Sequence, residues 1–438
     1  MDILIKALQF ILSLSFLIVL HELGHFIPAK IFKTRVEKFY LFFDYKFSLF
    51  KTKIGETVYG IGWIPLGGYV KISGMIDESM DTEQMKQPAQ PWEFRSKPAW
   101  QRLIIMLGGV TVNFILGILI YIMIVFVWGV DSIKPTDLKY GFAVNELMHE
   151  YGFKDGDKIL KFDGVEPLDV TAINKHLFLR GITSLEVMHQ DGTIETLTIP
   201  ENIGDEMWAK GVMEPFSVRT EPVIDTVVAD SPAEKAGLLK NDKIVSVNGS
   251  PVGYWQDFTK LIQNSKEGDI SVDVERDGTV KTIVLTPRED KTIGVSNSLM
   301  NSVTVEHKDY SFMESIPKGN SLAIWTLKDY ITQFKYVFTK KGATSIGGFI
   351  AIGNIFPATW SWQAFWSITA FLSIMLAFMN LLPIPALDGG HVMFTLYEMI
   401  TGRKPSDKFL EYAQITGFLL LIALLLLANG NDVVKLFS

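Results

Sequence analysis

The residues best suited to chemistry lie near the start of the chain, where two histidines flank a glutamate. They form the motif His21-Glu22-Leu23-Gly24-His25. On a helix, residues four apart share one face, so both imidazoles can bind one metal ion, commonly zinc. Glu22 lies beside them and can reach a metal-bound water as a general base. The alternative is a surface cluster without a metal, because the motif alone is only moderately specific.

A catalytic zinc site also needs a third protein ligand, and Asp388 is the best candidate. It follows the segment Asn380-Leu381-Leu382-Pro383-Ile384-Pro385-Ala386-Leu387 and precedes two glycines. The prolines bend the chain, the glycines permit close approach, and such irregular backbone is tolerated at membrane depth only inside protein or beside water. Two alternatives stay open: Asp388 could cap a following helix, and His391 suits a loop or an outer position better than a fourth ligand.

The composition indicates that these residues belong to a membrane protein with some soluble mass. Of 438 residues, 48% are hydrophobic and 20% charged, and the mean hydropathy is +0.23. Uncharged apolar segments predict transmembrane helices over residues 103–130, 364–387 and 412–431. The N-terminal apolar stretch runs into the histidine motif and predicts a further span over residues 1–30. A cleaved signal peptide is the alternative, but no small-residue cleavage site follows.

Basic residues place the connection between the first two spans, residues 31–102, in the cytoplasm. Both termini and the block over residues 131–362 then lie outside. With Lys30 at the boundary, His25 lies about 7.5 Å and His21 about 13.5 Å into the bilayer. Ionisable groups at that depth are costly and usually functional, and metal coordination would remove most of the cost. The basic residues are Lys30, Lys33, Arg35, Lys38, Arg95, Lys97 and Arg102.

The external block contains an internal repeat. Residues 151–164 align with residues 236–249, and residues 191–196 align with residues 277–282. The turn and strand pattern resembles PDZ domains, most clearly over residues 231–238, and predicts modules over residues 135–220 and 221–305. Such modules either bind a peptide or C-terminus at a sheet edge or act only as a spacer or size filter. Residues 310–341 predict an amphipathic helix, either on the membrane surface or packed on the second module.

The combined pattern resembles the site-2 protease family of intramembrane zinc metalloproteases. The resemblance implies a polytopic α-helical membrane protein, with four transmembrane helices, a metalloprotease core and two β-rich PDZ-like domains between spans two and three. By that likeness His21, His25 and Asp388 bind one catalytic zinc ion and Glu22 is the general base. Asn380 and a membrane-associated β-hairpin containing Gly68, Tyr69, Val70 and Lys71 would hold an extended substrate. The glycines Gly108 and Gly109 and the nearby Asn113 also fit the family, although close helix packing alone explains the glycines.

We therefore expect regulated proteolysis of single-pass transmembrane proteins within a bacterial inner membrane. By family likeness the substrates are an anti-sigma factor in a stress response or remnant signal peptides, and the PDZ-like domains act as a size filter or gate. A non-catalytic scaffold and a transporter are the competing classes, but a scaffold has no use for Glu22 and a transporter should show matching broken helices. The absence of cysteine excludes thiol chemistry, and the charge of −7 gives no sign of nucleic-acid binding.

Overall fold

The computed structural model describes residues 2–75 and 87–437. Contacts divide the chain into two compact units. Residues 1–129 and 309–438 form the helical unit, and residues 130–308 form the β-rich unit. The chain thus leaves the helical unit once, after residue 129, and returns to it at residue 309.

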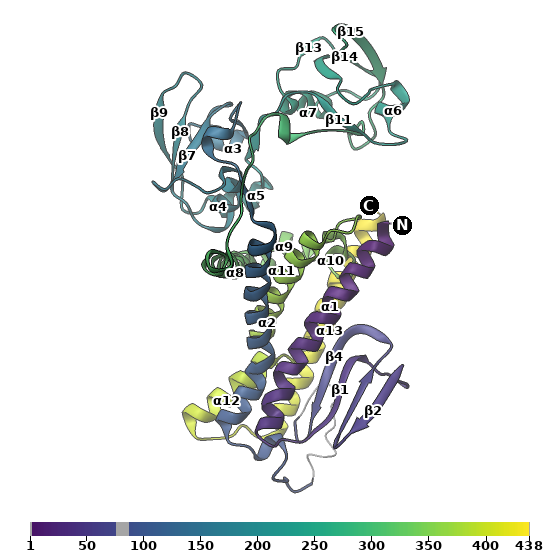
Figure 1. Ribbon diagram of the computed structural model, residues 1–438, viewed down its shortest axis with the longest axis vertical. Coiled ribbons are helices and arrows are strands. Elements are labelled where there is room, and N and C mark those ends of the chain that lie inside the picture. Colours follow the sequence, from purple (N-terminus) through teal and green to yellow (C-terminus); the bar gives the residue numbers. More distant parts are fainter. Residues whose placement is uncertain (1, 76–86, 438) are drawn as a thin grey trace. The chain divides into compact units, whose positions relative to one another are not determined.

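Four helices of the helical unit are long and apolar enough to cross a membrane, which confirms the prediction of a helical membrane protein. In Figure 1, α1 begins and α13 ends at the same end of this unit. The third of the four ends at Leu381 rather than at residue 387, because Pro383 and Pro385 cannot continue the helical hydrogen bonds. The four are α1 (Asp2–Ile31), α2 (Ala99–Trp128), α11 (Trp362–Leu381) and α13 (Asp407–Phe437).

Helix α2 packs against α1, α8, α11 and α12. Its contact with α1 is a backbone contact, since a Cβ on Gly108 would lie 1.9 Å from the Gly24 carbonyl oxygen. Helix α8 begins with a capping box at Ser311 and packs on α2 through Gly319. The predicted amphipathic helix is therefore packed on transmembrane helices along part of its length. The remaining helices of this unit are α8 (Phe312–Phe334), α9 (Lys340–Ser345), α10 (Phe349–Ile355) and α12 (Asp388–Thr401).

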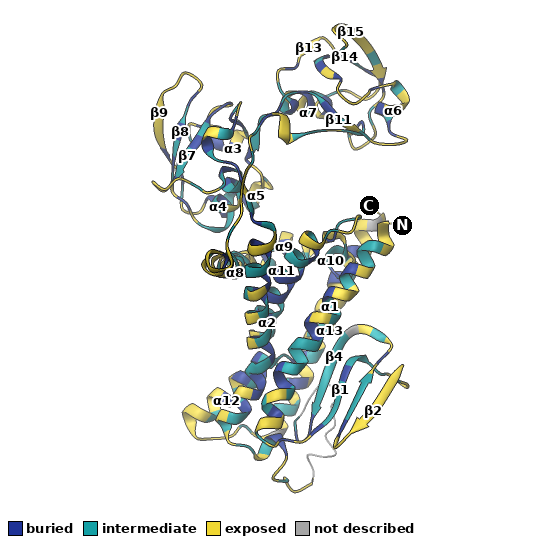
Figure 2. Ribbon diagram, in the orientation of Figure 1, coloured by how far each residue is buried: buried dark blue, intermediate teal, exposed yellow. Residues whose placement is uncertain are grey.

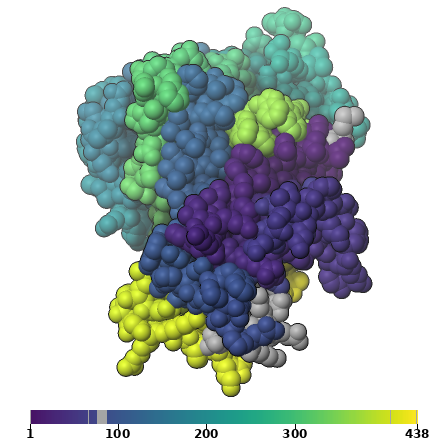
Figure 3. Space-filling model, turned by 60° about the horizontal axis from the view of Figure 1, so that its bottom comes forward, coloured from purple at the N-terminus to yellow at the C-terminus, as the bar shows by residue number. Residues whose placement is uncertain are grey.

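A four-stranded sheet follows α1 and has the order β2-β3-β1-β4. Strands β1 and β4 are antiparallel, whereas β1 and β3 are parallel. Strand β4 is an edge strand and lies next to α1, where a Cβ on Gly68 would lie 2.6 Å from Ile18. The sheet as a whole lies beside α1 in Figures 1 and 3. The opposite edge, β2, is exposed along its whole length (Figure 2). The strands are β1 (Val36–Phe43), β2 (Phe50–Ile54), β3 (Thr57–Ile61) and β4 (Ile64–Ile72).

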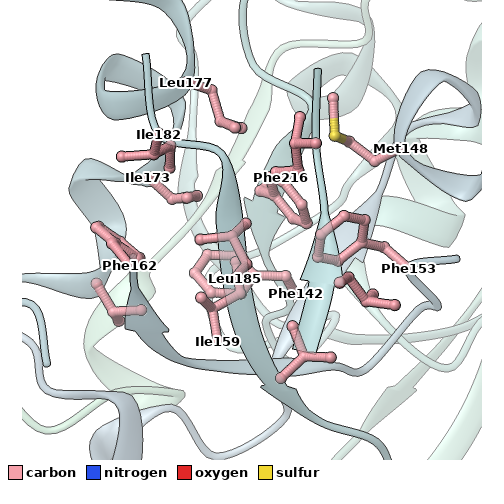
Figure 4. Packing of buried hydrophobic residues seen from close by; sticks show 14 of the residues in the cluster. Phe142, Met148, Phe153, Ile159, Phe162, Ile173, Leu177, Ile182, Leu185 and Phe216 are labelled. Carbon is pink, nitrogen blue, oxygen red and sulfur yellow. The ribbon is translucent and has the colours of Figure 1, made fainter. Parts of the chain in front are cut away.

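The first half of the β-rich unit has its own hydrophobic core, in which Phe142, Phe153 and Phe216 meet side chains of the β7-β8-β9 sheet (Figure 4). Its elements are β5 (Val130–Ser132), β6 (Phe142–Val144), α3 (Glu146–His149), β7 (Lys158–Phe162), α4 (Ile173–Leu179), β8 (Ser184–Met188), β9 (Ile194–Thr198), α5 (Ile203–Lys210) and β10 (Phe216–Val218).

The second half has a separate core around the β13-β12-β14-β15 sheet. Strand β17 then pairs with β5, so the entry and exit of the β-rich unit are hydrogen-bonded to each other. The elements are β11 (Ile224–Val227), α6 (Pro232–Ala236), β12 (Lys243–Val247), β13 (Ser250–Pro251), α7 (Trp255–Gln263), β14 (Ile270–Arg276), β15 (Thr279–Leu285), β16 (Val295–Asn297) and β17 (Glu306–Lys308).

The two halves repeat each other in detail. Asp163 and Asn248 occupy the same turn with φ of 46° and 49°, and each side chain accepts a hydrogen bond from the start of the next long strand. The strand pairs β7/β8 and β12/β14 also carry a register shift at corresponding places, after Ile159 and after Ile244. The repeated sequence therefore forms a repeated structure.

Candidate metal centre

Three side chains from two distant segments meet beside α2. His21 and His25 project from α1, and Asp388 is the first residue of α12. Oδ2 of Asp388 lies 3.3 Å from Nε2 of His21 and 3.2 Å from Nε2 of His25, and the two Nε2 atoms are 3.3 Å apart. The three thus form a nearly equilateral triangle of two imidazole nitrogens and one carboxylate oxygen. These are ligand types that zinc prefers.

The triangle has the size that a zinc ion requires. With metal–ligand bonds of about 2.0–2.1 Å, a tetrahedral site separates its ligand atoms by about 3.3–3.4 Å. Within the described part of the chain, the buried Oδ2 of Asp388 has no hydrogen bond of good geometry. Gly109 faces both rings, and a Cβ there would lie 2.4 Å from Nε2 of His25. An unsatisfied oxygen beside a space kept open by glycine fits a bound cation.

The other nitrogens of the two rings are held by α2. Nδ1 of His25 lies 2.8 Å from the Ile105 carbonyl oxygen, so this nitrogen carries the proton and leaves Nε2 free for a metal. Nδ1 of His21 lies 3.1 Å from the carboxamide of the fully buried Asn113. The sequence indicated Asn113 only as part of a packing motif. Its contact with the ring depends on how α1 packs against α2.

Asp388 is brought to the rings by the irregular segment between α11 and α12. The N-cap of α12 is Leu387, and the carboxylate of Asp388 points to the histidines, so helix capping does not account for this residue. A Cβ on Gly389 would lie 2.1 Å from the Leu382 carbonyl oxygen, which explains the glycine after Asp388. His391 lines the cavity beside the centre but is not one of the three grouped ligands.

Glu22 lies in a cavity of about 640 Å³ between α1, β4 and the start of α12. The backbone N–H of Val70 donates a hydrogen bond to the Glu22 carboxylate. All the other residues predicted to contact substrate also line this cavity, including Asn380, whose Nδ2 lies 3.4 Å from Nε2 of His21. The full predicted set in the cavity wall is Gly68, Tyr69, Val70, Lys71 and Asn380.

Two polar residues on β4 are held by neighbours in the sheet. The Tyr69 hydroxyl donates to Asp44 at 2.7 Å, and Lys71 lies 3.7 Å from Glu37. Gly68 occupies the other face of the strand, towards α1, where a Cβ would lie 2.6 Å from Ile18. Strand β4 therefore has a crowded face against α1, and its polar side chains lie on the opposite face of the sheet.

Comparison with known proteins identifies the relatives of this chain. Residues 9–424 match peptidase family M50. The chain is 30% identical to the regulator of sigma E protease of Haemophilus influenzae, with 98% of each chain covered. It is 28% identical to the regulator of sigma-E protease RseP of Escherichia coli, again over 98% of each, and 28% identical to the protease RseP of Yersinia pestis over the full length of both. These matches confirm the predicted resemblance to the site-2 protease family, and the relatives named here are RseP-type members of it.

Proposed function

The chain belongs to peptidase family M50 and is a zinc-dependent metalloprotease of the membrane, and from this premise we propose that it hydrolyses peptide bonds within the bilayer at the centre formed by His21, His25 and Asp388. The triangle of ligand atoms carries the proposal, because two of its three side chains, His21 and His25, lie on a helix apolar enough to cross a membrane. Three protein ligands leave a fourth position open for chemistry.

In this proposal Glu22 is the general base and later the general acid. When bound, zinc supplies a Lewis acid that activates water and polarises the scissile carbonyl. Glu22 accepts the proton of the attacking water and returns it to the leaving amine. The Val70 N–H holds the Glu22 carboxylate toward the cavity. The protein thus places its base beside the ligands without making the base a ligand.

Strand β4 and Asn380 would hold the substrate. A transmembrane helix has its scissile amides hydrogen-bonded internally, so it must unwind before cleavage, and pairing with an edge strand replaces those bonds. Strand β4 pairs with β1 on one side and borders the cavity that contains Glu22. Gly68, Tyr69, Val70 and Lys71 would supply backbone and wall contacts to the extended segment.

For the whole chain we propose a bacterial inner-membrane location with both termini and the β-rich unit in the periplasm. The basic residues around residues 31–102 support this orientation. The two repeated halves would act as PDZ-like modules that exclude bulky ectodomains or bind a peptide. Single-pass proteins, such as an anti-sigma factor or a remnant signal peptide, are the proposed substrates, and the naming of the relatives as regulators of sigma E supports the first.

The test uses the full chain in lipid nanodiscs with a model single-pass substrate. We expect Glu22→Gln to keep its zinc content and to lower cleavage by about 100-fold or more, because only the proton carrier is lost. Asp388→Asn should lose cleavage and also weaken zinc binding. Glu56→Gln, in the exposed turn after β2, is the matched control and should cleave as the wild type does. Wild-type cleavage by Glu22→Gln would refute the assigned base.

A further inference from the structure

The segment that carries Asp388 is held in a strained conformation. Ala386, two residues before Asp388, has φ of 80°. Residues with a Cβ rarely adopt this left-handed backbone conformation, and they keep it only where the surrounding structure restrains them. Any relaxation at Ala386 would turn the following peptides and shift the Asp388 carboxylate. The structure must therefore contain a restraint on this residue.

Gln414 of α13 supplies that restraint. Its Oε1 accepts a hydrogen bond from the Ala386 N–H at 3.2 Å, in a buried position. Gln414 is 5% exposed, whereas most side chains of the membrane-spanning part of α13 are exposed to the surroundings of the helix. A polar side chain inside a membrane protein is costly unless it is paired. Its pairing here is with the backbone of the strained residue.

The next turn of α13 is shaped to the same segment. Gly417 lies three residues after Gln414 and so on the same face of the helix. A Cβ on Gly417 would lie 1.6 Å from the Pro385 carbonyl oxygen. The helix therefore approaches the loop at backbone distance, and the Gln414 amide can reach the Ala386 N–H without bending the loop away.

From these contacts we infer that Gln414 is a positioning residue, which holds Ala386 in its left-handed conformation and so aims Asp388 at the two histidines. The inference rests on the proposed function, because it takes Asp388 as a ligand. In this inference α13 supports the metal centre, although it supplies none of the three ligands His21, His25 and Asp388.

The test measures zinc affinity of the full chain in nanodiscs by competition with a chelator, with cleavage as a second readout. We expect Gln414→Leu to weaken zinc binding by about tenfold or more, as loss of an outer support does in other zinc sites. Gln414→Glu keeps an acceptor oxygen and should retain most of the wild-type affinity for zinc. Thr416→Val, at an exposed position of the same helix, is the matched control and should bind zinc normally.

A double-mutant cycle separates positioning from general stability. Glycine adopts a φ of 80° without strain. In an Ala386→Gly background, Gln414→Leu should therefore change zinc affinity by less than about threefold. An equal loss in both backgrounds would overturn the inference, as would normal zinc binding by Gln414→Leu. If Asp388→Asn also left zinc affinity unchanged, the assigned ligand set itself would be wrong, which is a different result.

Discussion

The ring nitrogens of the two histidines decide whether the centre can take a metal. A neutral imidazole that binds a metal through Nε2 carries its proton on Nδ1 and needs an acceptor there. His25 has such an acceptor in the Ile105 carbonyl oxygen. For His21 the neighbour is the Asn113 carboxamide, whose Oδ1 is buried and has no hydrogen bond from the described residues. Rotation of this carboxamide by 180° exchanges Nδ2 and Oδ1 and supplies the acceptor.

Asn113 should therefore act through its oxygen. We expect Asn113→Asp, which can only accept at this position, to keep zinc affinity within about threefold of the wild type, and Asn113→Leu to weaken it by about ten- to 100-fold. Chelator competition on the full chain measures both. Equal losses in the two variants would mean that Asn113 acts by packing alone and does not set the proton of His21.

Among the elements, α2 leaves room for the metal centre because two of its residues facing α1 are glycines. Gly108 lets the backbone of α2 touch that of α1, and Gly109 faces the rings of His21 and His25. A larger residue at either place would separate the helices or enter the centre. The same helix presents Ile105 and Asn113 to the rings. Helix α2 thus forms one wall of the metal centre, although none of the three ligands His21, His25 and Asp388 belongs to it.

This arrangement predicts the effect of one added methyl group. Gly109→Ala should lower zinc affinity by at least about tenfold, because its Cβ would occupy the space beside Nε2 of His25. Gly117→Ala, on the same helix, is the matched control for crowding, since its Cβ would meet the buried Ile374 side chain of α11 and not the histidine rings. Zinc content after dialysis against a chelator gives the comparison. Normal zinc binding by Gly109→Ala would contradict the placement of the ion.

At the scale of the whole chain, the two halves of the β-rich unit share a buried aspartate but differ in its partner. Asp157 accepts a hydrogen bond from His189 at 2.7 Å, and the corresponding Asp242 is bound by Arg276. The hydrogen bond to Asp157 raises the pKa of His189 above its ordinary value of 6.5; Glu195 also raises this pKa, whereas burial of the ring and the charge of Lys154 lower it. Arginine keeps its charge at every relevant pH. At this buried aspartate, only the first half therefore has a pH-sensitive partner.

The pH dependence follows from the direction of this shift. A pKa that is higher in the folded state gives stability that is complete below about 6.5 and lost as the pH rises through the folded value. We expect hydrogen exchange, corrected for intrinsic rates, to show weaker protection of β7, β8 and β9 at pH 8.5 than at pH 6. Protection of β12, β14 and β15 should stay constant, and His189→Gln should remove the difference. Equal changes in both sheets would contradict the assignment.

Local spacing in the sequence determined the parts of this protein that depend on one element at a time. Helical periodicity alone puts His21 and His25 on one face, apolar length predicts the spans, and an 85-residue offset reveals the repeat. The left-handed Ala386 and the contacts of Asn113 and Gln414 were decided by tertiary structure. These features depend on how closely separate helices pack. The spacing of residues along one helix does not encode the distance between two helices. Glycines and buried amides determine that distance only when the helices pack against each other.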